Sequence, residues 1–362
     1  MRLNVLSTVA ACIAVACAGL ADAAQVDPGL HLVYAVTRTS EGLPSTTLYT
    51  HALSSGERRA FYHDKSEQKR ILVKIAGSDV LGAARAIPPR DVYVMMGPAS
   101  VEQAAVCADT LTRLRIPAGE EEASYEPLFV VPLCFSDASP YGLWNRAPIF
   151  AVGGRAERVA LPALRVGETK LEGPTVRVLS GQGTEEWQIP LRHRELYVAD
   201  LAWSPDGATL AYLVMPIGDV HTLDEALLPM AGIYVARASE KTSRQLYHCY
   251  GDALVWGPKP NRLTVAARTG DVWGTGSVIR VIQLPAGRRT EEFSVPGRVS
   301  AIAYSEDNQW LVVQTRDDHA QQLWLYASEG GYGRLFCNVS QEEGRLALLG
   351  WAQLPTAPNG DQ

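Results

Sequence analysis

The fold of this chain is determined by one stretch, residues 201–212, which reads LAWSPDGATLAY. In it, Ser204-Pro205-Asp206-Gly207 follows Trp203 and separates two apolar segments. Proline presets φ at the first corner of a turn, an aspartate side chain bonds its own backbone, and glycine adopts the positive φ that the turn needs. The apolar residues on either side alternate as they do in β-strands. The stretch therefore predicts a β-hairpin.

The same layout recurs at a nearly constant interval. It returns in full at residues 253–266 (ALVWGPKPNRLTVA) and 301–313 (AIAYSEDNQWLVV), and its first strand returns at 348–351. The aromatic landmarks Trp203, Trp256, Tyr304 and Trp351 are 53, 48 and 47 residues apart. This spacing is typical of propeller blades and is long for a helical solenoid repeat.

Each hairpin is followed by two more strand-like runs joined by a polar turn. After the hairpin at 201–212, for example, these runs are residues 233–236 and 244–247. Four strands per period form the blade of a β-propeller. Residues 144–152 are a fainter member of the series.

The amino-terminal segment fits the same scheme with an offset. Residues 30–36, 46–53 and 59–62 read as the second, third and fourth strands of a blade. The missing first strand is expected from residues 346–351, near the other end of the chain. A shared blade of this kind closes the ring and removes an exposed sheet edge.

The repeat predicts an all-β, six-bladed propeller with short helical insertions. Besides the shared blade, units begin near residues 65, 144, 201, 254 and 300. The unit at 65–140 is long, and its residues 99–111 predict a short helix capped by Ser100; if it held two blades, the ring would have seven. A second insertion, residues 218–229, predicts a helical turn over 223–228.

The motif Trp203-Ser204-Pro205-Asp206-Gly207, followed by Leu210-Ala211-Tyr212, resembles the WD40-like (PD40) repeat of TolB-type propellers. The resemblance covers residues 144–355. Two later turns, 257–260 and 305–308, keep the turn chemistry but depart from the full motif. The resemblance implies a propeller exported to a bacterial envelope.

The first 23 residues predict a secretory signal. Met1-Arg2, an apolar run over residues 5–20 and the site Ala21-Asp22-Ala23 match such a signal, with cleavage after Ala23. The alternatives are a membrane anchor and a lipoprotein attached through Cys17, since residues 14–17 resemble a lipobox. After cleavage we expect no integral membrane segment, a single propeller domain at 24–355, a disordered tail at 356–362, and a periplasmic or secreted location.

The net charge and the positions of the histidines and cysteines argue against nucleic acid, anionic lipid and metal ions as partners. A net charge of −6 gives no support for nucleic acid or anionic lipid. The seven histidines form no close ligand pair and no CxxC motif occurs, so we expect neither a metal nor another cofactor. Four cysteines lie beyond the signal, at Cys107, Cys134, Cys249 and Cys337. Cys107 and Cys134 would bridge within one unit, and the alternative is free buried thiols.

No catalytic spacing is present, because no G-x-S-x-G elbow occurs. The stretches 210–214 and 263–267, interpreted as inner strands, are largely apolar, with Arg268 and Arg316 only at their ends. We therefore predict a monomeric, non-catalytic propeller that binds another envelope or extracellular protein. The alternative is a small-ligand binder, for a sugar, peptide or cation, or a hydrolase or lyase, that uses the central funnel.

Two groups of residues are candidates for binding. The insertion carries Asp219, His221, Asp224 and Glu225, which are interpreted as partner-binding residues. The alternatives are a cation site and the solvated start of a helix, where acidic residues are favoured. Trp273, in the glycine-rich segment 269–276, is a candidate for stacking on a ligand. Its alternative role is packing at a blade edge.

Overall fold

The computed structural model describes most of the chain. The described residues are 26–40, 43–63, 74–75, 91–96, 107–117, 123–133, 150–153, 157–166, 171–218, 221–257, 259, 261–317, 319–340 and 343–354. They form strands β1 to β24 and one short 3-10 helix, η4. The predicted signal at 1–23, the tail at 356–362, Ser100 and Cys17 lie outside them.

The described strands form six four-stranded antiparallel sheets, numbered I to VI in chain order. Sheet I contains β24 (Arg345–Gln353), β1 (Leu30–Ser40), β2 (Leu43–Ala52) and β3 (Arg58–His63). Sheet II contains β4 (Lys74–Ile75), β5 (Asp91–Met96), β6 (Cys107–Arg115) and β7 (Ser124–Leu133). Sheet III contains β8 (Ala151–Gly153), β9 (Arg158–Val166), β10 (Leu171–Ser180) and β11 (Glu185–Pro190).

The other three sheets hold the strongest repeats. Sheet IV contains β12 (Leu196–Trp203), β13 (Thr209–Pro216), β14 (Gly232–Arg237) and β15 (Ser243–Tyr247). Sheet V contains β16 (Gly251–Trp256), β17 (Arg262–Arg268), β18 (Ser277–Gln283) and β19 (Arg288–Val295). Sheet VI contains β20 (Arg298–Tyr304), β21 (Trp310–Arg316), β22 (Ala320–Ala327) and β23 (Arg334–Ser340).

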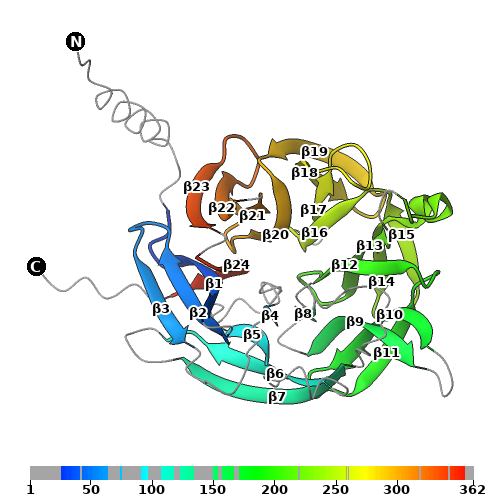
Figure 1. Ribbon diagram of the computed structural model, residues 1–362, viewed down its shortest axis with the longest axis horizontal. Helices are drawn as coiled ribbons and strands as arrows, with labels where there is room; N and C mark the ends of the chain where they lie inside the picture. Colours follow the sequence, from blue (N-terminus) through cyan, green and yellow to red (C-terminus); the bar gives the residue numbers. More distant parts are fainter. Residues whose placement is uncertain are drawn as a thin grey trace, which may run out of the picture.

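The sheets stand around a common centre, as the blades of a propeller do (Figure 1). The first strand of each sheet lies innermost, so that β4, β8, β12, β16, β20 and β24 surround the centre. The first strands of sheets IV, V, VI and I contact one another in this order. The all-β propeller predicted from the repeat is confirmed.

Buried apolar side chains fill the junctions between neighbouring sheets. One cluster joins sheets III and IV, another joins IV and V, and another joins V and VI. Further clusters join VI with I, I with II, and II with III. Because sheet IV packs between sheets III and V, its second strand is apolar on both faces. In β13, every residue from Leu210 to Pro216 is buried.

The SPDG turn and its equivalent in sheet VI have the same geometry. The Ser204 hydroxyl donates to Asp206 Oδ1 (2.5 Å) and accepts from the Thr209 amide (2.9 Å). In the later turn, Ser305 and Asp307 make the matching bond of 2.5 Å. Gly207 has φ of 66°, and Asn308 at the same position has φ of 57°. The turn therefore needs the left-handed region at this point, which glycine and asparagine adopt most easily.

Sheet I joins both ends of the chain. β1 pairs with β24 in an antiparallel ladder, in which Leu32 lies opposite Trp351. The sequence offset places the missing first strand at residues 346–351, and β24 occupies that position. The pairing gives β1 a neighbour on each side, and β24 takes the innermost position that the first strand has in the other sheets.

One predicted helix is corrected. Residues 107–111 of the expected helix at 99–111 belong to strand β6, which pairs with β7 over its whole length. Threonines at 110 and 112 favour a strand, because β-branched side chains fit a pleated sheet better than a helix. Residues 99–106 lie outside the described residues. The helical turn predicted at 223–228 is present as η4 (Glu225–Met230).

Candidate binding site on the propeller

The connections between strands divide the propeller into two faces. Because the sheets are antiparallel, the turns after the first and third strands lie at one end of each sheet, and the connection after the second strand lies at the other. We name the first end the turn face, since it carries Ser204–Gly207. The other end is the insertion face, which carries η4 between β13 and β14 and residues 269–276 between β17 and β18.

The motif residues Trp203 to Gly207 serve the fold. Trp203 is buried, and its ring lies so close to Gly153 in sheet III that a Cβ added there would be 2.4 Å from Trp203 Cγ. Ser204 is also buried and is bonded within the turn. Pro205 and Asp206 lie at the corner of the hairpin on the turn face. These residues join sheets III and IV and shape a turn, and they do not converge on a site.

The insertion is held against the propeller by several contacts. Asp224 caps η4 by accepting a 2.9 Å bond from the Ala226 amide. Leu227 is buried in the cluster between sheets III and IV. The Gln245 side chain donates to the carbonyl oxygens of Pro229 (3.1 Å) and Ala231 (2.9 Å). These contacts hold residues 224–231 against sheets III and IV.

The candidate residues of the insertion face solvent. His221, Asp224 and Glu225 are exposed, whereas Asp219 lies outside the described residues. The described part of the chain contains no group of three or more metal-ligand side chains. Asp224 has a structural role as the cap, and His221 and Glu225 are the other exposed candidates among the described residues.

Trp273 lies on the same face. Its side chain is 38% exposed, and its backbone amide donates a 3.0 Å bond to Asp271 Oδ1. The segment 269–276 joins two strands and opens no helix, as the sequence indicates. The tryptophan is thus partly packed and partly open to solvent.

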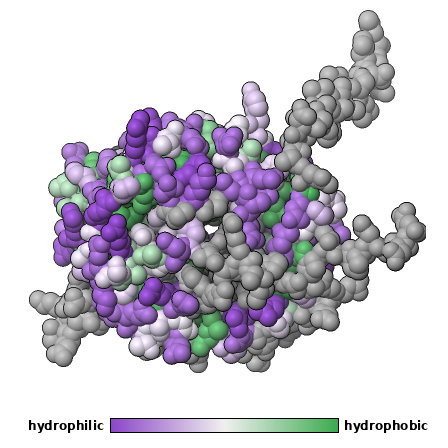
Figure 2. Space-filling view, turned by 180° about the vertical axis from the view of Figure 1, so that it is seen from behind, coloured by the Kyte–Doolittle hydropathy of each residue, from purple (hydrophilic) through white to green (hydrophobic). Residues whose placement is uncertain are grey.

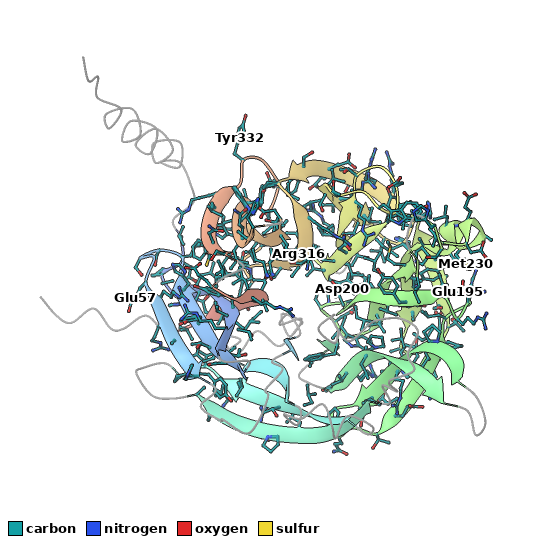
Figure 3. All side chains as sticks on the ribbon, in the orientation of Figure 1. Glu57, Glu195, Asp200, Met230, Arg316 and Tyr332 are labelled. Carbon is teal, nitrogen blue, oxygen red and sulfur yellow. The ribbon has the colours of Figure 1, made fainter. Side chains whose placement is uncertain are left out.

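Charged side chains do occur in the innermost strands, contrary to the expectation from sequence. The stretches 210–214 and 263–267 were interpreted as inner strands, but they belong to the second strands β13 and β17. Three of the six innermost strands, β12, β16 and β20, carry Asp200, Asp252 and Arg298. Asp200 and Arg316 are seen toward the centre of the ring in Figure 3.

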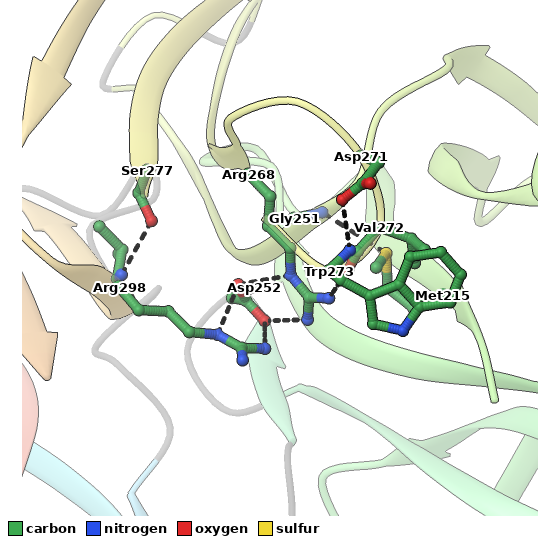
Figure 4. Close-up of polar contacts among 10 residues, drawn as sticks. Met215, Gly251, Asp252, Arg268, Asp271, Val272, Trp273, Ser277 and Arg298 are labelled. Carbon is green, nitrogen blue, oxygen red and sulfur yellow. Dashed lines mark hydrogen bonds and ion pairs between the residues drawn. The ribbon is translucent and has the colours of Figure 1, made fainter. Parts of the chain in front are cut away.

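Asp252 is the centre of an ion-pair cluster at the junction of sheets V and VI (Figure 4). It accepts two bonds from Arg268, at 2.9 and 2.5 Å, and two from Arg298, at 3.2 and 2.7 Å. Arg268 is 8% exposed, Asp252 11% and Arg298 36%. Arg268 also donates to the Val272 carbonyl oxygen, which ties the cluster to the Trp273 segment.

Electrostatics distinguish the two aspartates of the inner strands. Burial would raise the pKa of Asp252, but hydrogen bonds and charges from Arg268 and Arg298 outweigh it and hold that pKa below its usual value. Among the described residues, no arginine lowers the pKa of Asp200. Burial raises this pKa to about 7, although hydrogen bonds from the Leu254 and Leu201 amides act to lower it. Its bond to Leu254, at 2.7 Å, links sheets IV and V.

Sequence reasoning missed this cluster because it concentrated on the second strand of each repeat. The signal that would have found it is the charge just before each aromatic landmark, as at Asp252 before Trp256 and Arg298 before Tyr304. The cysteines remain separate from it. Cys249 and Cys337 are free thiols, and the side chains of Cys107 and Cys134 lie outside the described part of the structure.

The surface is predominantly polar. Hydrophilic residues dominate the view in Figure 2, and hydrophobic residues form small separate patches. Among the described residues, the large apolar side chains with substantial exposure are Trp273, Tyr332 and Leu335. Tyr332 lies in the turn between β22 and β23, and Leu335 lies at the start of β23, so both belong to the turn face. Of these three exposed side chains, Trp273 is the one on the insertion face.

Comparison with known proteins supports the fold. No protein-family model matches the sequence, and no curated protein matches it. TolB from Acinetobacter baumannii superposes with a TM-score of 0.54 at 12% identity, over 89% of this chain and 66% of that one. The chain thus spans slightly less than two thirds of that protein. A TolB-type protein of Agrobacterium tumefaciens gives a TM-score of 0.51 at 11% identity, over 90% of this chain and 99% of the other. The chain is a TolB-like β-propeller by its fold.

Proposed function

We propose that this chain is an exported, non-catalytic propeller that binds another envelope or extracellular protein through its insertion face. The TolB-like fold supports a scaffold role, and the signal-like residues 1–23 support export to the periplasm or beyond. None of the helices in the described residues has the length and apolar character needed to cross a bilayer.

The observation that carries the proposal is the ordered insertion. Its cap at Asp224, its buried Leu227 and its bonds from Gln245 fix its shape before any partner arrives. A preformed loop loses less conformational entropy on binding than a mobile one. His221 and Glu225 stand exposed on this support.

Trp273 gives the same face an aromatic anchor. Partly exposed tryptophans are among the side chains that contribute most to protein interfaces, especially where their backbone is rigid. The Trp273 amide is bonded to Asp271, and Val272 next to it is buried and bonded to Arg268. These contacts hold the backbone at Trp273 in place on the insertion face.

The test is a crosslinking capture from the cell envelope with the chain from Ala24 onward as bait. A double variant, Glu225→Arg with Trp273→Ser, changes charge and aromatic area on the insertion face. It keeps the cap and the buried leucine that deletion of the whole insertion would remove. We expect the wild-type chain to capture a discrete protein and the double variant to lose it.

The matched control is Tyr332→Ser. Tyr332 is fully exposed, at 105%, and lies on the turn face, so its replacement should leave the capture unchanged. If the control lost capture and the double variant kept it, the interface would lie on the turn face, which would contradict the proposal. Unchanged thermal unfolding of each bait ensures that the comparison is between folded proteins.

A second candidate function is a small-ligand binder at the central funnel. It is favoured by one observation, the charged residues Asp252 and Arg298 in the innermost strands β16 and β20. Charged groups at the inner wall of a propeller supply polar contacts for a ligand that an apolar wall lacks. Screening sugars, peptides and divalent cations against the purified chain tests it, and saturable binding with no captured protein would favour this function over the first.

A further inference from the structure

Sheets V and VI have equivalent positions that their strand register defines. Trp256 pairs with Leu263, and Tyr304 pairs with Leu311, at the same place in each first hairpin. Both first strands then contain one extra residue at a bulge. This residue is Asp252 in β16 and Ser300 in β20.

The same counting identifies the arginines. Arg268 and Arg316 are the last residues of β17 and β21, each five positions after the paired leucine. Arg298 and Arg345 are the first residues of β20 and β24, each six positions before the aromatic landmark. All four lie at the ends of strands that meet the insertion face.

In sheet V, one carboxylate serves two arginines. Asp252 binds Arg268 of its own sheet and Arg298 of the next sheet, at 2.5 and 2.7 Å. The carboxylate thereby compensates a buried cation and joins sheet V to sheet VI. A guanidinium offers its donors in a planar fork that matches the two oxygens of a carboxylate.

In sheet VI, the corresponding carboxylate is missing. Ser300 occupies its position, is exposed, and donates a bond to the Gln314 carbonyl oxygen at 3.4 Å. Arg316 corresponds to Arg268, and Arg345 corresponds to Arg298. Both are exposed, and within the described ranges no acidic side chain forms an ion pair with either. Arg316 and Arg345 thus hold the strand positions equivalent to those of Arg268 and Arg298, and the position equivalent to Asp252 carries no carboxylate.

The described carboxylates closest in sequence have other partners. Asp317, next to Arg316, accepts bonds from the His319 and Ala320 amides, each at 2.8 Å. Glu343, two residues before Arg345, accepts a 2.9 Å bond from the Ser340 amide. Both are therefore turned to the backbone of their own loops, and neither takes the place that Asp252 has in sheet V.

We propose that Arg316 and Arg345, with Ser300 between them, form a binding site for the carboxylate group of an organic acid. The bound carboxylate takes the position that Asp252 has in the neighbouring sheet and accepts bonds from both guanidinium groups. Small Ser300 leaves room for it and offers a hydroxyl. The site lies on the insertion face, at the junction of sheets VI and I. This proposal names organic acids as the ligand class of the second candidate function, small-ligand binding. It does not depend on whether the chain also binds a protein.

The test is titration of the purified chain from Ala24 onward with malonate at constant ionic strength, followed by calorimetry. We expect saturable binding to the wild type. Arg316→Gln and Arg345→Gln should each weaken it by about tenfold or more, since each removes charge-assisted bonds to the ligand. Ser300→Asp should abolish it, because the new carboxylate pairs with both arginines as Asp252 does in sheet V.

Matched controls separate the site from general charge effects. Arg288→Gln replaces an exposed arginine of the outer strand β19 and should bind malonate as the wild type does. Neutral malonamide should not bind. Absence of saturable malonate binding to the wild type, or full binding by Ser300→Asp, would overturn the proposal. Capture of a protein partner is measured separately, so either proposal can fail without the other.

Discussion

The indole nitrogen of Trp256 donates a 3.0 Å hydrogen bond to the carbonyl oxygen of Ala202, which belongs to the preceding sheet. Trp351 does the same with Ala303, at 3.2 Å, and the Tyr304 hydroxyl bonds Thr264 Oγ1 of sheet V at 3.0 Å. Thus the aromatic landmarks of the repeat connect one sheet to the one before it. Trp203 differs, because its buried indole nitrogen has no hydrogen-bond partner among the described residues.

This difference allows the inter-sheet bond to be measured. Trp256→Phe removes the bond and leaves the buried Ala202 carbonyl without it, which should add about 1–3 kcal/mol to the cost of the lost volume. Trp203→Phe loses a similar volume but no bond, so it serves as the reference. We expect urea unfolding to show the larger loss of stability for Trp256→Phe. Equal losses in both variants would mean that the bond contributes nothing.

The positive φ in the first turn makes a second prediction. Gly207→Val forces a β-branched residue into the left-handed region and should lower the free energy of unfolding by on the order of 1–2 kcal/mol. The matched change in sheet VI, Asn308→Gly, relieves the same region and should leave stability nearly unchanged. An unaltered melting temperature for Gly207→Val would contradict the role of φ at this turn.

Much of the fold could be predicted because its determinants are local. A turn such as 204–207 and the aromatic residue before it are encoded within a few residues, so each hairpin is visible in the sequence by itself. The regular spacing of Trp203, Trp256, Tyr304 and Trp351 then supplies the architecture. The helix prediction is wrong at residues 107–111 because the periodicity of a short segment does not by itself distinguish a strand from a helix.

The charged cluster could not be predicted in the same way, because it depends on convergence. Asp252, Arg268 and Arg298 come from three strands of two sheets, and Arg298 is 46 residues from Asp252 in sequence. Their meeting requires the bulge at Asp252 and the packing of sheet V on sheet VI. The equivalent Ser300 shows that the repeat conserves the backbone position while its side chain changes.

The cluster itself gives a third prediction. Asp252→Asn leaves Arg268, which is almost fully buried, without a counter-charge, and removal of one partner from a buried ion pair costs about 3–5 kcal/mol. Arg298→Gln removes a partner that is more exposed and leaves the Arg268 pair in place, so its cost should be smaller. Differential scanning calorimetry of the two variants checks this order. A smaller loss for Asp252→Asn than for Arg298→Gln would contradict it.

The same aspartate determines how stability responds to acid. Because the pKa of Asp252 is lower in the folded chain than its usual value, the unfolded state binds its proton first as the pH falls. The stabilisation is therefore complete above the ordinary aspartate pKa of about 3.9 and is lost below it. The wild type should lose more stability than Asp252→Asn between pH 5 and pH 3, measured by urea unfolding. Parallel losses would show that this pair does not carry the acid sensitivity.

Asp200 should act in the opposite direction and in another pH range. Its pKa rises to about 7 in the folded chain, so between the unfolded value of about 3.9 and 7 the folded state binds the additional proton. Stability from this group is therefore greatest at low pH and decreases as the pH rises toward 7. Asp200→Asn removes this titration. The wild type should lose more stability than the variant between pH 5 and pH 8, measured by urea unfolding in buffers of equal ionic strength. Equal changes in both proteins would mean that the carboxylate stays ionised throughout and that its bonds to the Leu201 and Leu254 amides outweigh its burial.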